Sequence, residues 1–288
     1  VFLLPLVYVG ELVFFKKARD VFGGCFKIAV SGGGGIAPKL DRFYNAIGLR
    51  LVEGYGLTET APMVTLRSYR RPVLGTIGRP LDYCEIKIVN RHGVDCAPGQ
   101  LGVLYVRGPN VMKGYYNQPE LTEEVLQDGW FNTGDLVVRT VTGEISIKGR
   151  AKDTIVLRSG ENVEPLPIEN KLVESPYIAQ AVVVGQDQNC LGALIIPNKD
   201  NLKKYAEEKG IKYETMEELL KHEAIMNLFR ERIDTLQQQF AHYEQIKKFT
   251  LLPEPFSMAK GELTNTLKIK RSVLNKNYAA EIEKMYEE

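Results

Sequence analysis

Residues 26–60 read "FKIAVSGGGGIAPKLDRFYNAIGLRLVEGYGLTET", and the order of elements within this stretch decides the fold class. The apolar run 26–31 ends in four glycines, Gly32–Gly35, as a strand ends in a turn. Residues 37–48 then place apolar side chains at helical spacing and stop at a glycine. Residues 49–56 return as a second strand. Strand, turn, helix and strand in this order predict an α/β layer.

From about residue 74 the chain changes to short strands. The segments "EIKIVN", "GVLYVRG" and "GEISIKG" alternate apolar and polar side chains and are separated by Gly, Pro and Asn. This spacing predicts a small antiparallel sheet or distorted barrel. Between these strands, "QPELTEEVL" predicts one inserted helix, with Pro119 near its first turn.

After "IKGRAKD" (147–153) the pattern changes once more. "EPLPIENKLVES" predicts a helix, and "IAQAVVVGQD" and "CLGALIIP" predict strands. A long amphipathic helix is expected next, and a final helix is expected from about Leu267. The apolar stripe of the long helix comprises Ile225, Leu228, Phe229, Ile233, Leu236, Phe240 and Tyr243.

The length and composition fit two globular domains. The 288 residues are enough for two domains, and 44% hydrophobic with 25% charged residues is ordinary for a soluble protein. We place the domains at 1–150 and 151–288, the first made of a layer, 1–73, and a barrel, 74–150. Lys and Arg total 37 and Asp and Glu total 36, so no overall charge favours a nucleic acid partner. The four cysteines and three histidines have no metal-ligand spacing, which favours inert thiols over a zinc site or disulfide framework.

The first fifteen residues, "VFLLPLVYVGELVFF", are apolar but interrupted by Pro5, Gly10 and Glu11. A membrane span needs about 20 apolar residues, and a signal peptide needs a basic leader. We therefore expect neither, and predict a buried face in what looks like a piece cut from a longer protein.

Several short stretches have unusual local chemistry. The glycines in "SGGGG" lack Cβ atoms, which lets a ligand approach the backbone amides. In "EGYGLTET" (53–60), Tyr55 offers a ring for stacking, Thr58 a hydroxyl for phosphate and Glu59 a hard oxygen ligand for Mg²⁺. Each feature alone is more typical of an ordinary surface turn.

Three later stretches complete the pattern. Asp135 in "WFNTGDL" can accept hydrogen bonds from both hydroxyls of a ribose. Arg150 in "IKGRAKD" has a guanidinium that can donate to ribose or phosphate oxygens. "KGELTNTLKIKR" (260–271) ends in basic residues. Each is alone more typical of a strand start or a solvated face, but together with the earlier motifs they predict a nucleotide site.

These blocks, in this order, resemble those of the adenylate-forming enzymes, which include acyl-CoA synthetases, luciferases and peptide-synthetase adenylation domains. The resemblance covers most of residues 25–275. The wording of "SGGGGIAP", "EGYGLTET" and "GELTNTLKIKR" is closest to bacterial-type long-chain fatty acid–CoA ligases. This resemblance implies a mixed α/β and α+β architecture. The chain would begin with the end of the large domain, including its β-barrel, and continue into a small mobile C-terminal lid.

The resemblance implies roles for residues of the first domain. The aromatic residue that stacks on adenine matches Tyr55, and the aspartate that holds the ribose hydroxyls matches Asp135. The threonine that contacts phosphate matches Thr58, and the glutamate that binds Mg²⁺ matches Glu59. The glycines expected beside the nucleotide are Gly33, Gly34, Gly54 and Gly56.

The resemblance also implies roles from residue 150 onward. The arginine that supports the ribose contact matches Arg150, and the hinge about which the lid rotates matches Lys152. The lysine that reaches the α-phosphate and the acyl carboxylate matches Lys268, which would act with Thr58 and Glu59 in catalysis. Gly160 would line the tunnel for the pantetheine arm of coenzyme A.

The implied reaction is ATP-dependent activation of a long-chain fatty acid through an acyl-adenylate and its transfer to coenzyme A, giving acyl-CoA, AMP and pyrophosphate. An enzyme activating aryl or amino acids is the nearest alternative. A non-catalytic nucleotide-binding module is the alternative from another class, and the intact Glu59, Asp135, Arg150 and Lys268 argue against it. A Rossmann dehydrogenase is excluded because no Gly-x-Gly-x-x-Gly joins the strand to the helix.

One departure limits what the chain can do by itself. The family's phosphate loop, a Ser/Thr/Gly-rich stretch ending in Pro-Lys-Gly, does not occur in the sequence, and "SGGGGIAPKL" matches a later, adenine-side strand. We therefore expect the chain alone to be inactive. The expected location is cytoplasmic; the oligomeric state, the acyl chain length and a peripheral contact with the inner membrane face stay open.

Overall fold

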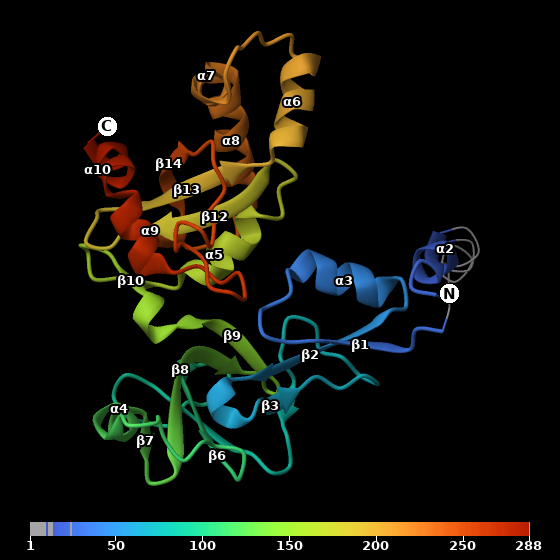
Figure 1. Ribbon diagram of the computed structural model, residues 1–288, viewed down its shortest axis with the longest axis vertical. Helices are drawn as coiled ribbons and strands as arrows, with labels where there is room; N and C mark the ends of the chain where they lie inside the picture. Colours follow the sequence, from blue (N-terminus) through green and yellow to red (C-terminus); the bar gives the residue numbers. More distant parts are fainter. Residues whose placement is uncertain (1–9, 11–13, 24, 288) are drawn as a thin grey trace. The chain divides into compact units, whose positions relative to one another are not determined.

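The computed structural model describes residues 10, 14–23 and 25–287 (Figure 1). The chain divides into two compact units, Val1–Lys148 and Gly149–Glu288, which we describe one at a time. The buried face predicted for the apolar start falls mostly outside the described residues. Among the described helices, none is long and apolar enough to cross a membrane.

The first unit contains the predicted α/β layer. After the short helix α2 (Lys16–Asp20), strand β1 (Ile28–Ser31) runs parallel to β2 (Arg50–Gly56), and helix α3 (Pro38–Ala46) connects them. Pro38 opens α3, where a missing amide proton costs nothing. Strands β3 (Met63–Leu66) and β4 (Arg79–Pro80) continue the sheet in the order β1-β2-β3-β4 (Figure 1). The one-turn helix η2 (Thr58–Thr60) connects β2 to β3.

The predicted antiparallel sheet follows in the same unit and forms half a barrel. Its strands are β5 (Glu85–Val89), β6 (Leu101–Arg107), β7 (Leu126–Gln127), β8 (Trp130–Arg139) and β9 (Ile145–Arg150), in the order β5-β6-β8-β7 with β9 beside β8. Side chains of β6 alternate between buried and more exposed, so one face of the sheet packs inward. The inserted helix α4 (Pro119–Val125) begins at the predicted proline.

The second unit is built around a three-stranded sheet. Strand β13 (Leu191–Pro197) lies between β12 (Ile178–Val184), which is antiparallel to it, and β14 (Ile246–Leu251), which is parallel. Every residue of β13 is buried, because helices pack on both faces of the sheet. One face meets α5 (Pro165–Leu172), α6 (Lys199–Glu208), α7 (Met216–Lys221) and α8 (Glu223–Leu236), and the other meets α9 (Arg271–Asn277) and α10 (Ala279–Glu287) (Figure 1).

Small elements complete this unit. Helix η3 (Ala151–Asp153) precedes the hairpin of β10 (Ile155–Val156) and β11 (Asn162–Val163), and η4 (His242–Glu244) precedes β14.

Two predicted helix boundaries were wrong. The long helix ends at Leu236, before Phe240 and Tyr243 of the expected stripe, because the buried Gln237 leaves the helix to bond the backbone of Ile246. The single helix predicted from about Leu267 is two helices, α9, which begins at Arg271, and α10, which follows from Ala279. Leu267 has φ +61°, a left-handed conformation that no α-helix contains.

Candidate functional site

The glycine loop after β1 leaves its backbone open. Gly33 has φ +82°, which favours glycine, and a Cβ at Gly33, Gly34 or Gly35 would meet no atom within 4 Å. The end of the loop is held by the Ile36 amide, which donates to Glu53 Oε1 at 3.1 Å. The backbone of the predicted loop is therefore exposed and uncovered by neighbouring side chains.

A buried arginine that sequence reasoning missed supports this loop. Arg67 is 2% exposed, and its guanidinium donates to Glu53 Oε2 at 2.8 Å and to Asp41 Oδ1 at 2.7 Å. Burial raises the pKa of Glu53, and the Ile36 amide and the Arg67 charge oppose this rise. The cluster joins α3, β2 and the glycine loop, and an arginine after a strand gives no sequence signal of such a role.

Gly54 and Gly56 of β2 lie close to Pro62 and Met63. A Cβ at Gly56 would lie 1.6 Å from the carbonyl oxygen of Pro62, and a Cβ at Gly54 would lie 2.7 Å from Met63 Cε. The backbone at Pro62 therefore requires glycine at position 56, whereas at position 54 the contact is only with the flexible end of the Met63 side chain.

The structure brings Tyr55 and Asp135 together across 80 residues of sequence. The Tyr55 hydroxyl donates to Asp135 Oδ2 at 2.5 Å, and the two residues are 8% and 5% exposed. Tyr55 packs with core side chains such as Val64 and Leu104, so its ring has a fixed position. The Asp135 amide donates to Thr133 Oγ1 at 3.1 Å, which orients the turn around the aspartate. The residues predicted for adenine and for ribose are thus neighbours.

Thr58 and Glu59 lie on η2, directly after β2. Thr58 is exposed and Glu59 is half-buried. Glu59 Oε1 accepts a hydrogen bond from the Tyr115 hydroxyl at 3.0 Å. Burial, together with the adjacent Glu59 carboxylate, raises the pKa of Tyr115, so this hydroxyl stays protonated as a donor. Sequence reasoning missed Tyr115, which lies in the stretch "MKGYY" (112–116) between the quoted motifs.

The residues around Glu59 fit Mg²⁺ in one specific way. Among the described residues, no group of three or more His, Cys, Asp or Glu side chains could hold a metal ion. Mg²⁺ is often held by only one or two carboxylates and completed by water and substrate phosphates. A single hard carboxylate beside the Thr58 hydroxyl meets this description, provided that a nucleotide supplies the other oxygens.

The predicted residues of the second unit lie on turns. Arg150 is half-buried at the end of β9, directly before η3, and Lys152 is exposed within η3. Gly160 has φ +95° at the tip of the β10–β11 hairpin, and a Cβ there would meet nothing within 4 Å. Lys268 is exposed at the end of a turn that begins at Thr264.

The Lys268 turn has a rigid base. The Thr264 amide donates to the Lys268 carbonyl at 2.8 Å, and the Lys268 amide donates to Thr264 Oγ1 at 3.0 Å. Below them Glu262 is 1% exposed and accepts from the Ser257 amide at 2.9 Å. The backbone of Lys268 is therefore anchored by hydrogen bonds, whereas its side chain is exposed.

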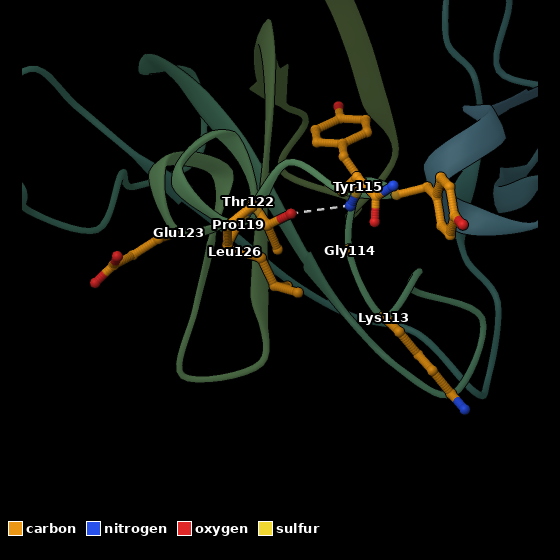
Figure 2. Close-up of a pocket in the computed structure, with 9 residues that line it drawn as sticks. Lys113, Gly114, Tyr115, Pro119, Thr122, Glu123 and Leu126 are labelled. Carbon is orange, nitrogen blue, oxygen red and sulfur yellow. Dashed lines mark hydrogen bonds between the residues drawn. The ribbon is translucent and has the colours of Figure 1, made fainter.

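A shallow pocket of about 500 Å³ lies in the first unit (Figure 2). Its lining includes Tyr115 and the start of α4 but neither Tyr55 nor Asp135. Figure 2 shows the Thr122 hydroxyl bonded to the backbone nitrogen of Tyr115, at 2.9 Å. The pocket is therefore separate from the predicted nucleotide residues, although Tyr115 contributes to both neighbourhoods.

Comparisons with known families match both parts of the chain. The family described as AMP-binding enzyme matches residues 6–116, and the one described as AMP-binding enzyme C-terminal domain matches residues 152–288. The two matches together include the glycine loop, Glu59, Lys152 and Lys268.

Curated relatives are longer than this chain. A chloroplastic probable acyl-activating enzyme of Arabidopsis thaliana is 41% identical, over 99% of this chain and 41% of its own length. A chloroplastic long-chain-fatty-acid–[acyl-carrier-protein] ligase of the same plant is 40% identical, over 99% and 39%. A long-chain-fatty-acid–CoA ligase of Mycobacterium tuberculosis is 33% identical, over 96% and 45%. The chain thus spans about two-fifths of the length of these relatives.

Solved structures share the architecture. O-succinylbenzoate CoA synthetase of Bacillus subtilis, in complex with its acyl-adenylate intermediate, is 27% identical with a TM-score of 0.68, over 86% of this chain and 46% of that one. The adenylation domain of a carboxylate reductase from Mycobacterium chelonae has a TM-score of 0.78 at 24% identity, over 98% and 42%. The second alignment confirms the predicted fold class.

Proposed function

The chain belongs to the family of AMP-binding enzymes, and from this premise we propose that it is the nucleotide-holding and C-terminal part of a long-chain fatty acid–CoA ligase. The proposed reaction joins a fatty acid to the AMP part of ATP with release of pyrophosphate. The thiol of coenzyme A then attacks the acyl carbon, and AMP leaves as the thioester forms.

The chemistry explains why a nucleotide is needed. A carboxylate is a poor electrophile because its negative charge resists attack and its leaving group would be an oxide. An acyl-adenylate has a neutral acyl carbon and AMP as a good leaving group. Bringing the carboxylate to the α-phosphate joins two anions, so the site needs positive charge and oriented donors at that point.

We assign the residues of the first unit to the nucleotide. The Tyr55 ring would contact adenine, Asp135 would accept from the ribose hydroxyls and Thr58 would donate to a phosphate. Glu59 would hold Mg²⁺, which when bound supplies charge neutralisation on the phosphates.

We assign the residues from 150 onward to the ribose contact and to the acyl transfer. Arg150 would support the ribose, and the Lys268 ammonium would neutralise the α-phosphate and the acyl carboxylate. Lys152 would be the hinge between the two half-reactions, and Gly160 would leave room for the thiol arm of coenzyme A.

The observation that supports this proposal most is the contact between Tyr55 and Asp135. One hydrogen bond fixes a ring and a carboxylate side by side, as a nucleoside requires for its base and its ribose. The open glycine backbone of the loop after β1 adds space for the ligand.

Calorimetric titration of the 288-residue chain with AMP tests the nucleotide site. We expect the wild-type chain to bind AMP. Asp135→Asn should raise the Kd for AMP, and the wild-type chain should bind deoxyadenosine monophosphate, which lacks a ribose hydroxyl, more weakly than AMP. Equal binding of AMP by the wild-type chain and by Asp135→Asn would refute the assignment.

We also propose that this chain forms no acyl-adenylate by itself, because its sequence contains no phosphate loop to cradle the triphosphate.

The thiol acceptor has two candidates. Coenzyme A is our proposal, and an acyl carrier protein is the second candidate because the relative named as a ligase for that acceptor is 40% identical. Thioester formation by the longer gene product that contains this chain, supplied with ATP, palmitate and each thiol in turn, distinguishes them. If kcat/KM is higher with the acyl carrier protein than with coenzyme A, the carrier protein is the acceptor and our proposal of coenzyme A is wrong.

A further inference from the structure

The segment 108–116 holds the turn that carries Glu59. The Met112 amide donates to the Glu59 carbonyl at 2.8 Å. The Asn110 side-chain amide donates to the carbonyls of Thr60 at 2.8 Å and Met63 at 3.0 Å. Three hydrogen bonds from one distant segment therefore fix the backbone at this glutamate and in the residues that follow it.

The same segment also fixes the Glu59 side chain. The Tyr115 hydroxyl donates to Oε1 at 3.0 Å, and within the described residues no other group donates to this carboxylate. Ordering a glutamate side chain costs conformational entropy. Because the hydrogen bond to Tyr115 orders Glu59 before any ligand binds, that entropy cost does not have to be met on binding. Because Oε1 accepts from Tyr115, Oε2 remains for another partner.

Tyr115 is itself held in place from a third element. Its backbone nitrogen donates to Thr122 Oγ1 (Figure 2). The Thr122 hydroxyl in turn donates to the Gln118 carbonyl at 2.8 Å, at the start of α4. Gly114 adopts φ +146°, and a Cβ there would lie 2.7 Å from Thr122 Cγ2. The chain therefore approaches α4 closely at this point, which anchors the backbone of Tyr115.

We propose that Tyr115 is a positioning residue that holds the Glu59 carboxylate in the orientation that binds a divalent cation. The inference rests on the proposed function, which assigns the metal to Glu59. An outer hydrogen-bond partner of a metal ligand typically affects metal affinity by about 10- to 100-fold. Tyr115 meets the structural requirements of such a partner, because it is a neutral donor, it contacts the ligand directly and its own backbone is anchored.

The test separates metal-dependent from metal-independent nucleotide binding. The probe is α,β-methylene-ATP, in which the bond cleaved during adenylation is blocked. Its Kd for the 288-residue chain is measured by calorimetry with saturating Mn²⁺ and again in EDTA, and the ratio of the two values reports the metal contribution. We expect Tyr115→Phe to reduce this ratio by about tenfold or more and to leave the Kd in EDTA unchanged.

Tyr116→Phe is the matched control. Tyr116 is the next residue, is 89% exposed, and loses the same hydroxyl in the same substitution. We expect the ratio of the Kd in EDTA to the Kd with Mn²⁺ to be the same for Tyr116→Phe as for the wild-type chain. Thermal unfolding of each variant is measured in parallel, and a purely structural role for Tyr115 predicts an equal loss of binding with Mn²⁺ and in EDTA, which would overturn the inference.

Glu59→Gln distinguishes failure of the inference from failure of the proposed function. If Glu59→Gln abolishes the metal contribution and Tyr115→Phe leaves it unchanged, Glu59 holds the metal without help and the inference is wrong. If Glu59→Gln has no effect, the metal assignment in the proposed function is wrong as well. The double variant should match Glu59→Gln alone, and additive losses would show that Tyr115 acts independently of Glu59.

Discussion

At the scale of single residues, the first unit holds its polar side chains by hydrogen bonds between elements. The hydroxyl of Tyr55 bonds Asp135, and that of Tyr115 bonds Glu59. In each pair a tyrosine from one segment orients a carboxylate from another. Because tyrosine is neutral at ordinary pH, it orients the carboxylate without cancelling the negative charge that a ribose hydroxyl or a cation would meet.

Tyr55→Phe should weaken AMP binding through Asp135. The substitution keeps the ring and removes the donor at 2.5 Å from Asp135 Oδ2. A hydrogen bond to a charged group contributes about 1.5–3 kcal/mol, so we expect the Kd for AMP to rise by roughly tenfold to a hundredfold. Calorimetry with AMP and with adenosine gives the measurement. An unchanged Kd would mean that Asp135 needs no partner to reach the ribose.

Glu144 should make the first unit sensitive to acid. The Thr142 and Thr140 hydroxyls donate to its carboxylate and Arg79 Nε donates at 2.9 Å, which lowers the pKa of Glu144 to about 2. A carboxyl whose pKa is lower in the folded chain stabilises it fully above the unfolded value of 4.5 and loses this contribution as pH falls towards 2.

Urea unfolding of the wild-type chain and of Glu144→Gln at several pH values measures this contribution. The wild-type chain should be more stable at pH 6 by on the order of 1 kcal/mol, since the Arg79 side chain is solvent-exposed and its ion pair adds little. The difference should shrink between pH 4.5 and pH 2. The exposed Glu231 serves as control, and a pH-independent difference for Glu144→Gln would contradict the linkage.

At the scale of elements, one ion pair joins three pieces of the second unit. Arg271 at the start of α9 donates to both oxygens of Glu169 on α5 at 2.6 Å, and Glu169 accepts from the Val183 amide on β12 at 2.8 Å. The Glu169 and Arg271 side chains are 7% and 15% exposed. Since α5 and α9 cover opposite faces of the sheet, this pair links the two hydrophobic cores of the unit.

Arg271→Met should therefore destabilise the second unit strongly. Removing one member of a buried pair leaves an uncompensated charge and typically costs about 3–5 kcal/mol. Replacing both members, as in Glu169→Leu with Arg271→Met, should cost less. Urea unfolding measures both, and Lys199→Met is the matched control because its pair with Glu254 is exposed and should contribute about 0–1 kcal/mol. An equal loss of unfolding free energy in Arg271→Met and Lys199→Met would show that burial of the ion pair does not matter for stability.

At the scale of the whole molecule, the chain consists of two compact units joined near residue 149. The proposed function assigns the nucleotide to the first unit and Lys268 and Lys152 to the second. Two half-reactions on one site favour a domain that changes its position between them. This rotation is a prediction, and it can be tested through rates.

Lys268→Ala and Lys152→Pro should impair different half-reactions in the longer gene product that contains this chain. Losing a transition-state contact typically costs about 3–4 kcal/mol, so Lys268→Ala should slow pyrophosphate exchange by roughly a hundredfold to a thousandfold. It should spare thioester formation from a pre-formed acyl-adenylate. Lys152→Pro fixes φ at the hinge and should do the reverse. Equal losses in both assays for both variants would remove the rotation from the proposed mechanism.

Local patterns predicted the α/β layer and part of the later elements, but not strand β8, helix α6 or strand β14. The glycine run after an apolar strand and the proline at the start of α4 are signals within a few residues, and strands, turns and caps depend on such neighbours. The same signals failed at the ends of helices. Gln237 ends α8 through a contact with Ile246, and the left-handed turn at Leu267 delays α9, so both boundaries depend on residues outside the helix.

Residue types and their order were enough to propose Tyr55, Asp135, Glu59 and Lys268 for a nucleotide, because their chemistry can be read without coordinates. Which side chains lie in contact could be learned only from the folded chain. The contact between Tyr55 and Asp135 spans 80 residues, and that between Glu59 and Tyr115 spans 56. The physical reason is that a hydrogen bond acts over about 3 Å in space, whereas sequence patterns report only neighbours along the chain.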